Sequence, residues 1–152
     1  MSPESWQAVA IALQALQLSI LLFHDWVPLG SLTDVQAVRR ADTPTYMLVG
    51  TAINSVPVGF ALWRSVADFG HAYPHGLKIA MWLIYGILFA GELQSWWIPY
   101  FLGASPSKIE RFQKMFGRTH AFLPVRHGIV PNTLHVILHL ATFATLLILT
   151  QF

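Results

Sequence analysis

Four long runs of apolar residues, separated by polar connections, organise this chain. They extend from Trp6 to Phe23, from Thr45 to Trp63, from Lys78 to Trp97 and from Pro131 to the C-terminus. Each run is close to the roughly 20 residues that a helix needs to cross about 30 Å of hydrocarbon. The pattern predicts an all-α integral membrane protein, a four-helix bundle that forms a single transmembrane domain over residues 1–152.

Composition supports a membrane protein and excludes several other classes. Hydrophobic residues make up 55% of the chain and charged residues 11%, whereas about a quarter of the residues in soluble proteins are charged. There is no cysteine, which excludes disulfides, thiolate metal sites and a cysteine nucleophile. The net charge of +2 comes without any basic run suited to DNA, so we expect no nucleic-acid partner. The first run begins beside Glu4 and lacks a basic leader, so we expect it to be retained as a helix.

Basic residues predict the orientation in the membrane. Four spans in series place both termini on one side and the first and third connections together on the other. Only Arg64 and Lys78 flank the second connection. The first and third connections contain the remaining basic residues: Arg39, Arg40, Lys108, Arg111, Lys114, Arg118 and Arg126. The positive-inside rule therefore predicts a protein of the plasma or inner membrane, with both long connections cytoplasmic and both termini outside.

The third connection contains two recognisable segments. PSKIERFQKMFG places Ile109, Phe112 and Phe116 on one helical face, a pattern typical of an amphipathic helix on the membrane surface. The following GRTHAFLPVRHGIVPN is punctuated by Gly and Pro and is predicted to be a loop. We expect this loop to fold over the bundle as a cytoplasmic lid between the third and fourth helices.

Polar residues within the apolar runs indicate a site, because a charge at mid-span costs about 2.5–3.5 kcal/mol. His135 and His139 are four residues apart on the fourth helix and therefore share a face. Glu92 lies in the half of the third helix nearer the cytoplasmic connections, and Asn54 precedes Pro57, where a kink is expected. Together with the end of the first helix, these positions predict a polar chamber near the cytoplasmic face.

The chamber residues indicate acid–base chemistry on a lipophilic substrate such as an isoprenoid or sterol. Glu92 would be the general acid or base and His135 its partner, with a further histidine as a second proton carrier, because histidine titrates near neutrality. The candidate catalytic residues are Glu92, His135, His24, Asp25 and His120. The candidate substrate-binding residues are Trp96, Trp97, Asn54, Tyr85, Asn132 and the arginines Arg118 and Arg126, which could hold an anionic head group. Isomerisation, cyclisation and epoxide opening all fit this set.

Each of these residues also has a structural interpretation. His135 and His139 could hydrogen-bond other helices and only hold the bundle together. The Trp96–Trp97 pair could belong to an aromatic belt at the membrane interface, and Asn132 could simply cap the fourth helix. Glu92 is the hardest to explain structurally, because a buried carboxylate must either pair or take up a proton.

Two further functions remain open. In the first, His135, His139 and Glu92 would bind a first-row metal, or the protein would bind haem; the acid–base hypothesis itself requires no cofactor. In the second, the protein would bind or transport a lipophilic small molecule without chemistry. Four helices are few for a transporter, so that function would require a homo-oligomer, with Gly86 and Gly91 allowing close helix packing.

The segment VPLGSLTDVQAV, from Val27 to Val38, resembles the end of the first helix in the emopamil-binding-protein-like (EXPERA) family. Pro28, Asp34 and the run Gln36 to Val38 carry the resemblance. It implies a small four-helix membrane protein with an acid-lined lipophilic pocket, as in the sterol isomerases of that family. It covers about twelve residues, and Glu92 and the paired histidines have no counterpart within it.

Overall fold

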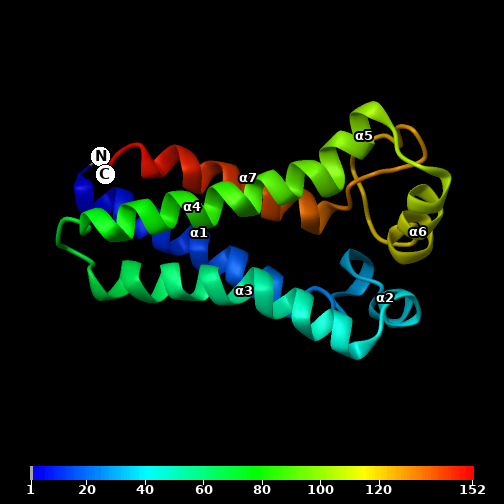
Figure 1. Ribbon diagram of the computed structural model, residues 1–152, viewed down its shortest axis with the longest axis horizontal. Helices are drawn as coiled ribbons and strands as arrows, with labels where there is room; N and C mark the ends of the chain where they lie inside the picture. Colours follow the sequence, from blue (N-terminus) through cyan, green and yellow to red (C-terminus); the bar gives the residue numbers. More distant parts are fainter. Residues whose placement is uncertain (1) are drawn as a thin grey trace.

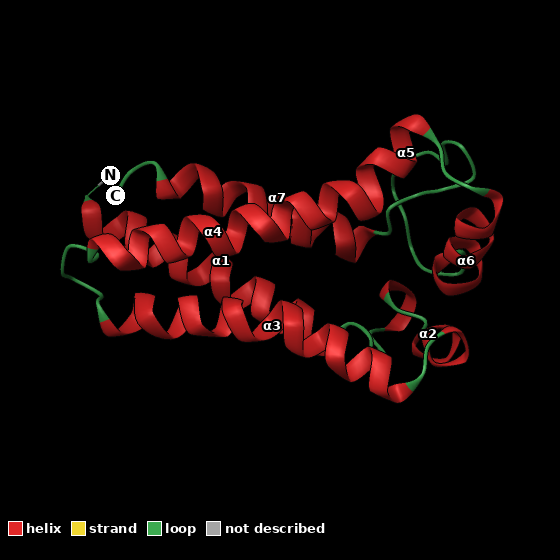
Figure 2. Ribbon diagram, viewed as in Figure 1, coloured by secondary structure: helices red, strands yellow, loops and turns green. Residues whose placement is uncertain are grey.

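The computed structural model describes residues 2–152, which are 74% helical and contain no strand (Figure 2). The α-helices are α1 (Pro3–Phe23), α2 (Val35–Ala41), α3 (Pro44–Ala67), α4 (His75–Glu92), α5 (Ile98–Leu102), α6 (Pro106–Phe116) and α7 (Thr133–Leu149). A 3₁₀ turn η1 (Gly30–Leu32) precedes α2, and a π-helical turn η2 (Leu93–Trp97) joins α4 to α5. The all-α prediction is confirmed, while α2 was not expected.

Three helices are long and apolar enough to cross a membrane. They are α1, α3 and the continuous helix from His75 to Leu102. Helix α7 is apolar but has only 17 residues, which at about 1.5 Å per residue is roughly 25 Å. It packs against α1 and α4, and α1 also packs against α3 (Figure 1).

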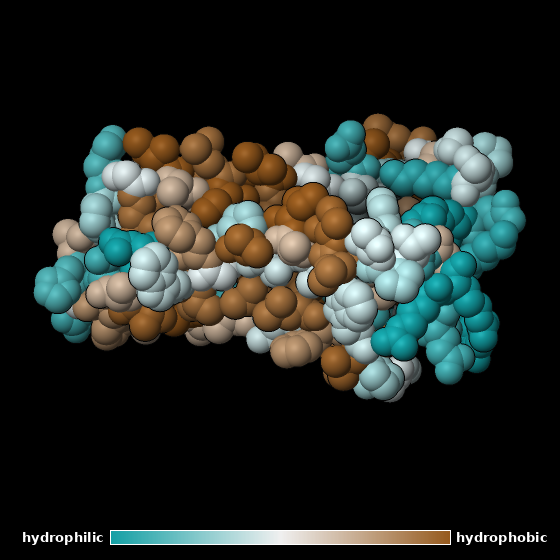
Figure 3. Space-filling view, turned by 60° about the horizontal axis from the view of Figure 1, so that its bottom comes forward, coloured by the Kyte–Doolittle hydropathy of each residue, from teal (hydrophilic) through white to brown (hydrophobic). Residues whose placement is uncertain are grey.

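The surface has the distribution expected of a membrane protein. Figure 3 shows apolar residues along the middle of the long helices and polar residues gathered at the two ends. Large apolar side chains stand exposed on the long helices, among them Ile53, Val56, Leu83, Ile87 and Leu140. Exposing so many large apolar side chains to water is unfavourable, whereas lipid solvates them, and helices pair most of their backbone polar groups internally.

Capping residues explain where the long helices begin. Ser2, Thr43 and Asn132 each precede a helix and accept a hydrogen bond from the backbone N–H three residues later. Side-chain oxygens at this position satisfy donors that the first turn leaves free. Proline follows Ser2 and Thr43 in the first turn, where its missing N–H costs nothing.

The third apolar run predicts a helix that ends at Trp97, and this end is wrong, because the chain stays helical to Leu102. Pro99 cannot donate to the carbonyl of Ser95, and the wider π-helical turn just before it accommodates the missing bond. The helix ends instead at Gly103, which has a φ of 90°, a conformation that glycine adopts without strain. Trp96 and Trp97, which end the π-helical turn, lie on different faces of the helix because they are consecutive residues.

The ends of the molecule differ in architecture. Both termini and the α3–α4 turn lie at one end, whereas α2, α5 and α6 lie at the other (Figure 1). At that second end, Val38, Met47 and Met115 form a small apolar cluster, and Arg111 pairs with Asp42 across it. Helices α3 and α4 diverge toward this end in Figure 1, and their divergence leaves room for the cavities described next.

Candidate functional site

A cavity of about 350 Å³ lies between α3 and α4, with α1 and α7 behind it. Its polar lining residues come from all four helices and the π-helical turn: His24, Asn54, Glu92, Ser95, His135 and His139. A neighbouring cavity of about 340 Å³ between α1 and α3 shares Leu21, His24, Ile53 and Asn54 with it, and adds Asp25 and Asp42. The structure therefore brings together several residues that the sequence placed near one face.

Glu92 ends α4 and is buried, with 5% of its surface exposed. Its Oε1 accepts a hydrogen bond from Thr142 Oγ1 at 2.8 Å, and Thr142 Oγ1 is also 3.1 Å from Gln17 Oε1. Glu92 Oε2 is buried and has no hydrogen-bond partner in the described part of the chain. An unpartnered carboxyl oxygen in an apolar setting is costly, so this group requires a proton or a donor from a bound molecule.

His135 is fixed in one tautomer by Asn132. The Asn132 Oδ1 accepts the backbone N–H of His135 at 2.9 Å, which identifies this atom as the amide oxygen. The same oxygen lies 2.7 Å from His135 Nδ1, so Nδ1 must be the protonated nitrogen. In the neutral ring the Nε2 atom is then an acceptor.

His139 is fixed in the opposite tautomer by Trp97. The indole Nε1, which can only donate, lies 3.0 Å from His139 Nδ1. Nδ1 must therefore accept, and in this arrangement the ring is neutral with its hydrogen on Nε2. The centroids of the two imidazole rings are 6.0 Å apart. Two residues that line the cavity thus differ in tautomer, with an acceptor Nε2 on His135 and a donor Nε2–H on His139.

His24 and Asp25 connect the cavity to the end of the bundle. His24 Nδ1 donates to the carbonyl of Ile20 at 2.9 Å, and its Nε2 lies 3.3 Å from Asp25 Oδ2, within the distance of an ion pair. Burial raises the pKa of Asp25, an effect that His24 opposes. The His24 ring packs edge-on against His135 with centroids 5.4 Å apart.

A small cavity lies on the outer side of this histidine pair. Its volume of about 10 Å³ is lined by His24, Asp25 and His135 together with Asp34 and Thr119. A space of about 10–15 Å³ with polar partners is enough for one water molecule. The site therefore has room for a water between its histidines and Asp34 at the end of the bundle.

The cavity between α3 and α4 is also lined by backbone and side-chain polar groups of α3. Pro57 lies inside α3 and cannot donate to the carbonyl of Ile53, which lines both larger cavities. Asn54 is exposed there and donates to the carbonyl of Gly50 at 2.9 Å. A Cβ added to Gly91 on the facing helix would meet open space. Polar groups exposed on membrane helices are costly, and their position here favours a bound molecule with polar atoms.

The aromatic candidates occupy different surroundings. Trp96 lines the cavity and packs on His135 with ring centroids 4.1 Å apart. Trp97 lies on another face of the helix, in a separate groove. Tyr85 is buried in the apolar core, has a hydroxyl without a partner in the described chain, and lines neither of the two larger cavities.

The candidates from the third connection lie outside both larger cavities. His120 is exposed and its Nδ1 is 2.7 Å from Thr133 Oγ1, a contact that fixes the loop to the start of α7. The Arg118 side chain is 85% exposed, and Arg126 lies over α5. The loop reaches the small cavity only through Thr119, so the expected lid over the chamber stays a prediction.

The metal-binding alternative has no assembled ligand set. Over residues 2–152, no group of three or more His, Asp or Glu side chains lies close enough to hold a metal ion. His135 and His139 each have Nδ1 engaged by another side chain, and Glu92 is bonded to Thr142. The geometry thus favours an acid–base set over a coordination shell.

Sequence reasoning left two members of the buried network out of the candidate set. Thr142 holds Glu92, and Gln17 donates to Thr145 at 2.8 Å. The spacing could have identified both residues, since Thr142 follows His139 by three residues and Gln17 precedes His24 by seven, which places each pair on one helical face.

Comparisons with known protein families, with characterised proteins and with solved structures found no match to this chain. The function is therefore argued from the site itself.

Proposed function

We propose that this protein is a small integral membrane enzyme that transfers protons on a lipophilic substrate bound between α3 and α4. The observation that carries the proposal is the pair of opposed imidazole tautomers beside the buried Glu92 carboxyl. Such an arrangement holds a base and an acid at one place in a water-poor cavity, which is what general acid–base catalysis requires.

The roles follow from the hydrogen bonds. His135 Nε2 is the acceptor that removes a proton from substrate carbon. His139 Nε2–H donates a hydrogen bond to a substrate oxygen or π-bond. Glu92 delivers or receives the second proton, with Thr142 orienting its carboxyl group. Removal of a proton at one carbon and its return at another shifts a double bond without any co-reactant, so isomerisation needs the fewest components; cyclisation and epoxide opening use the same groups.

The lining residues also indicate which substrates fit. No lysine or arginine lines either of the two larger cavities among the described residues. An anionic head group would meet Glu92, Asp25 and Asp42 without compensation. The apolar members Ile53, Ile84, Ile87 and Leu88 fit a hydrocarbon body, so a neutral lipophile with a hydroxyl, carbonyl or epoxide oxygen suits the site. Arg118 and Arg126 are not needed for this binding.

The substrate site needs proton exchange with water after a net transfer. His24 lines both larger cavities and the water-sized one. A proton carried by the neighbouring His24 and Asp25 side chains would pass through the water to Asp34 at the end of the bundle. His24 and Asp25 are thus proton carriers in this proposal and do not bind the substrate.

The proposed orientation in the membrane follows from the basic residues. Helices α1, α3, α4 and α7 would all cross the bilayer, α7 with the shortest span. The end containing α2, α5 and α6 holds most of the Lys and Arg residues and would face the cytoplasm. Both termini would then lie outside, and the proton route through His24 would open toward the cytoplasm.

The proposal is tested by carbon–deuterium exchange, which needs no known substrate. Detergent-purified protein is incubated in D2O with the total lipid extract of the membranes that produced it, and mass spectrometry identifies lipids that gain carbon-bound deuterium. We expect one lipid class to be labelled by the wild type and not by Glu92→Gln, which keeps the shape but cannot release a proton. Glu110→Gln, at an exposed position on α6, is the matched control and should label normally.

Two results would contradict the proposal. Labelling that persists in Glu92→Gln would remove the carboxyl group from the chemistry. A lipid that binds stoichiometrically but never gains deuterium in the wild type would instead indicate a lipophile-binding protein without proton transfer.

A further inference from the structure

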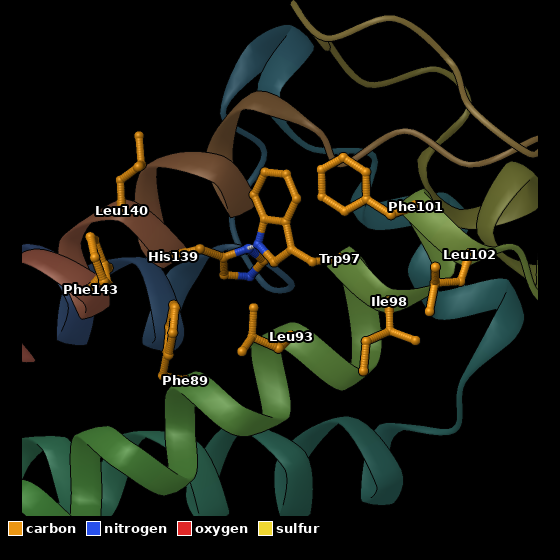
Figure 4. Close-up of a pocket in the computed structure, with 9 residues that line it drawn as sticks. All are labelled: Phe89, Leu93, Trp97, Ile98, Phe101, Leu102, His139, Leu140 and Phe143. Carbon is orange, nitrogen blue, oxygen red and sulfur yellow. Dashed lines mark hydrogen bonds between the residues drawn. The ribbon is translucent and has the colours of Figure 1, made fainter.

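A second, separate groove runs along another face of the same helices. Its volume is about 530 Å³, and its walls come from α4, the π-helical turn, α5 and α7 (Figure 4). The lining residues are Phe89, Leu93, Trp97, Ile98, Phe101, Leu102, His139, Leu140 and Phe143. All but Trp97 and His139 are pure hydrocarbon, and these two satisfy each other through the 3.0 Å hydrogen bond.

Stacked aromatic pairs give the groove a fixed shape. Phe89 of α4 stacks on Phe143 of α7 with ring centroids 5.6 Å apart. Trp97 stacks on Phe101 of α5 at 5.9 Å. Figure 4 shows the Leu93 side chain between these pairs, directed into the groove. The groove lies within the apolar belt, so a hydrocarbon chain is the molecule that it is suited to hold.

A basic side chain is held at the α5 end of this groove. The Arg126 guanidinium lies 5.6 Å from the ring centroid of Tyr100 and 5.7 Å from that of Phe101, which lines the groove. The Tyr100 hydroxyl donates to the carbonyl of Pro124 at 3.0 Å and so ties the loop to α5. Among the described residues, no ion pair includes Arg126.

A tight turn fixes the position of Arg126. Its N–H donates to the Ile129 carbonyl at 2.9 Å and its carbonyl accepts from the Ile129 N–H at 2.8 Å. The two residues between them, His127 and Gly128, have φ values of 50° and 77°, as in the primed turns of hairpins. A Cβ on Gly128 would come within 2.8 Å of Ile109 Cγ2, so the turn is also packed closely onto α6.

We propose that this groove and Arg126 form a binding site for an anionic phospholipid of the surrounding leaflet. The phosphate would pair with the unpaired guanidinium, and one acyl chain would lie along the aromatic walls. Arginine is the side chain best suited to phosphate, and the apolar groove continues from it toward the bilayer centre. The site explains why a tight turn places an arginine without an ion-pair partner beside the groove, in a loop that lines neither polar cavity. It does not depend on the proposed enzyme activity.

Lipid titration followed by native mass spectrometry tests this site. Protein in detergent is titrated with phosphatidylglycerol and, separately, with phosphatidylcholine carrying the same acyl chains. We expect the first phosphatidylglycerol molecule to bind about fivefold more tightly, the effect typical of one basic residue near an anionic lipid. Arg126→Gln should make the two lipids equal, whereas Arg118→Gln, at an exposed arginine of the same loop, should keep the preference.

A second pair of variants tests the groove. Leu93→Trp fills it and should weaken the first binding event for both lipids. Leu83→Trp, at an exposed position of α4 outside the groove, is the matched control and should have no effect. Circular dichroism verifies that each variant is folded. The proposal is overturned if the wild type binds both lipids equally, if Arg118→Gln removes the preference as well as Arg126→Gln, or if folded Leu93→Trp binds like the wild type.

Discussion

The hydroxyl of Thr142 should determine how the Glu92 carboxyl group is held, and Thr142→Val isolates its effect. Valine has the same shape as threonine but cannot donate a hydrogen bond. In the structure, Thr142 Oγ1 is the only described partner of Glu92, at 2.8 Å from Oε1, and Oε2 has none. The substitution therefore leaves both carboxyl oxygens without a partner, and it also removes the 3.1 Å contact of Thr142 Oγ1 with Gln17 Oε1.

The expected cost follows from the surroundings of this bond. Hydrogen bonds between helices in membranes average about 0.6 kcal/mol and reach about 1.7 kcal/mol. Leaving a buried acceptor unpaired costs about 1–3 kcal/mol. Thr142 is fully buried and Glu92 is 5% exposed, so the lost bond lies in the interior of the bundle. We expect Thr142→Val to lower the free energy of unfolding by about 1–2 kcal/mol.

A double-mutant cycle separates this bond from other effects of the valine. The free energy of unfolding is measured by sodium dodecyl sulfate titration in mixed micelles for the wild type, Thr142→Val, Glu92→Met and the double variant. With methionine at position 92 only the contact with Gln17 is left to lose, so the added valine should cost at least about 0.5 kcal/mol less than it does in the wild type. An equal cost of Thr142→Val in both backgrounds would refute the claim that the hydroxyl acts through Glu92.

Three further substitutions have expected outcomes. Trp97→Phe removes the donor to Nδ1 of His139, so nuclear magnetic resonance of labelled histidine should detect both tautomers of that ring instead of one. Gly91→Leu places a side chain in the cavity between α3 and α4 and should reduce deuterium labelling of lipid at least tenfold. Gly86→Leu is the control, because its side chain meets open space outside that cavity and its neighbour between α1 and α3, and it should label normally. Burial raises the pKa of Asp25 in the folded protein, so the folded state loses stability as the pH rises from the usual pKa of aspartate to the raised one. Asp25→Asn should therefore stabilise the protein at neutral pH. Below about pH 4, near the usual pKa of aspartate, both proteins carry a neutral side chain and the advantage should disappear.

The helices were largely predictable from the sequence because apolar runs of membrane length have few alternatives. Asn132 was recognised in the sequence as a possible helix cap, and it does cap α7. The end near Trp97 was predicted wrongly, because proline normally stops a helix and the π-helical turn that accommodates Pro99 has no signature in the sequence. Helix α2 was missed for a related reason, since its 7 residues are too short for a periodic pattern to stand out.

The candidate site was predictable in part. Glu92, His135, His139, His24 and Asn54 line one cavity, and the sequence placed them there because polar residues inside apolar runs are few and helical spacing fixes their faces. The positions of loop residues could not be obtained in the same way. Loop conformation depends on contacts such as that of His120 with Thr133, and no periodicity encodes such contacts.

The most direct test of the account is a measurement of the two histidine tautomers. Solid-state nuclear magnetic resonance of protein with ¹⁵N-labelled histidine in lipid distinguishes a proton on Nδ1 from one on Nε2, and His135→Gln and His139→Gln assign the signals. The account predicts a neutral His135 ring protonated on Nδ1 and a neutral His139 ring protonated on Nε2. Identical tautomers, or a doubly protonated ring at either position, would contradict the proposed pairing of base and acid.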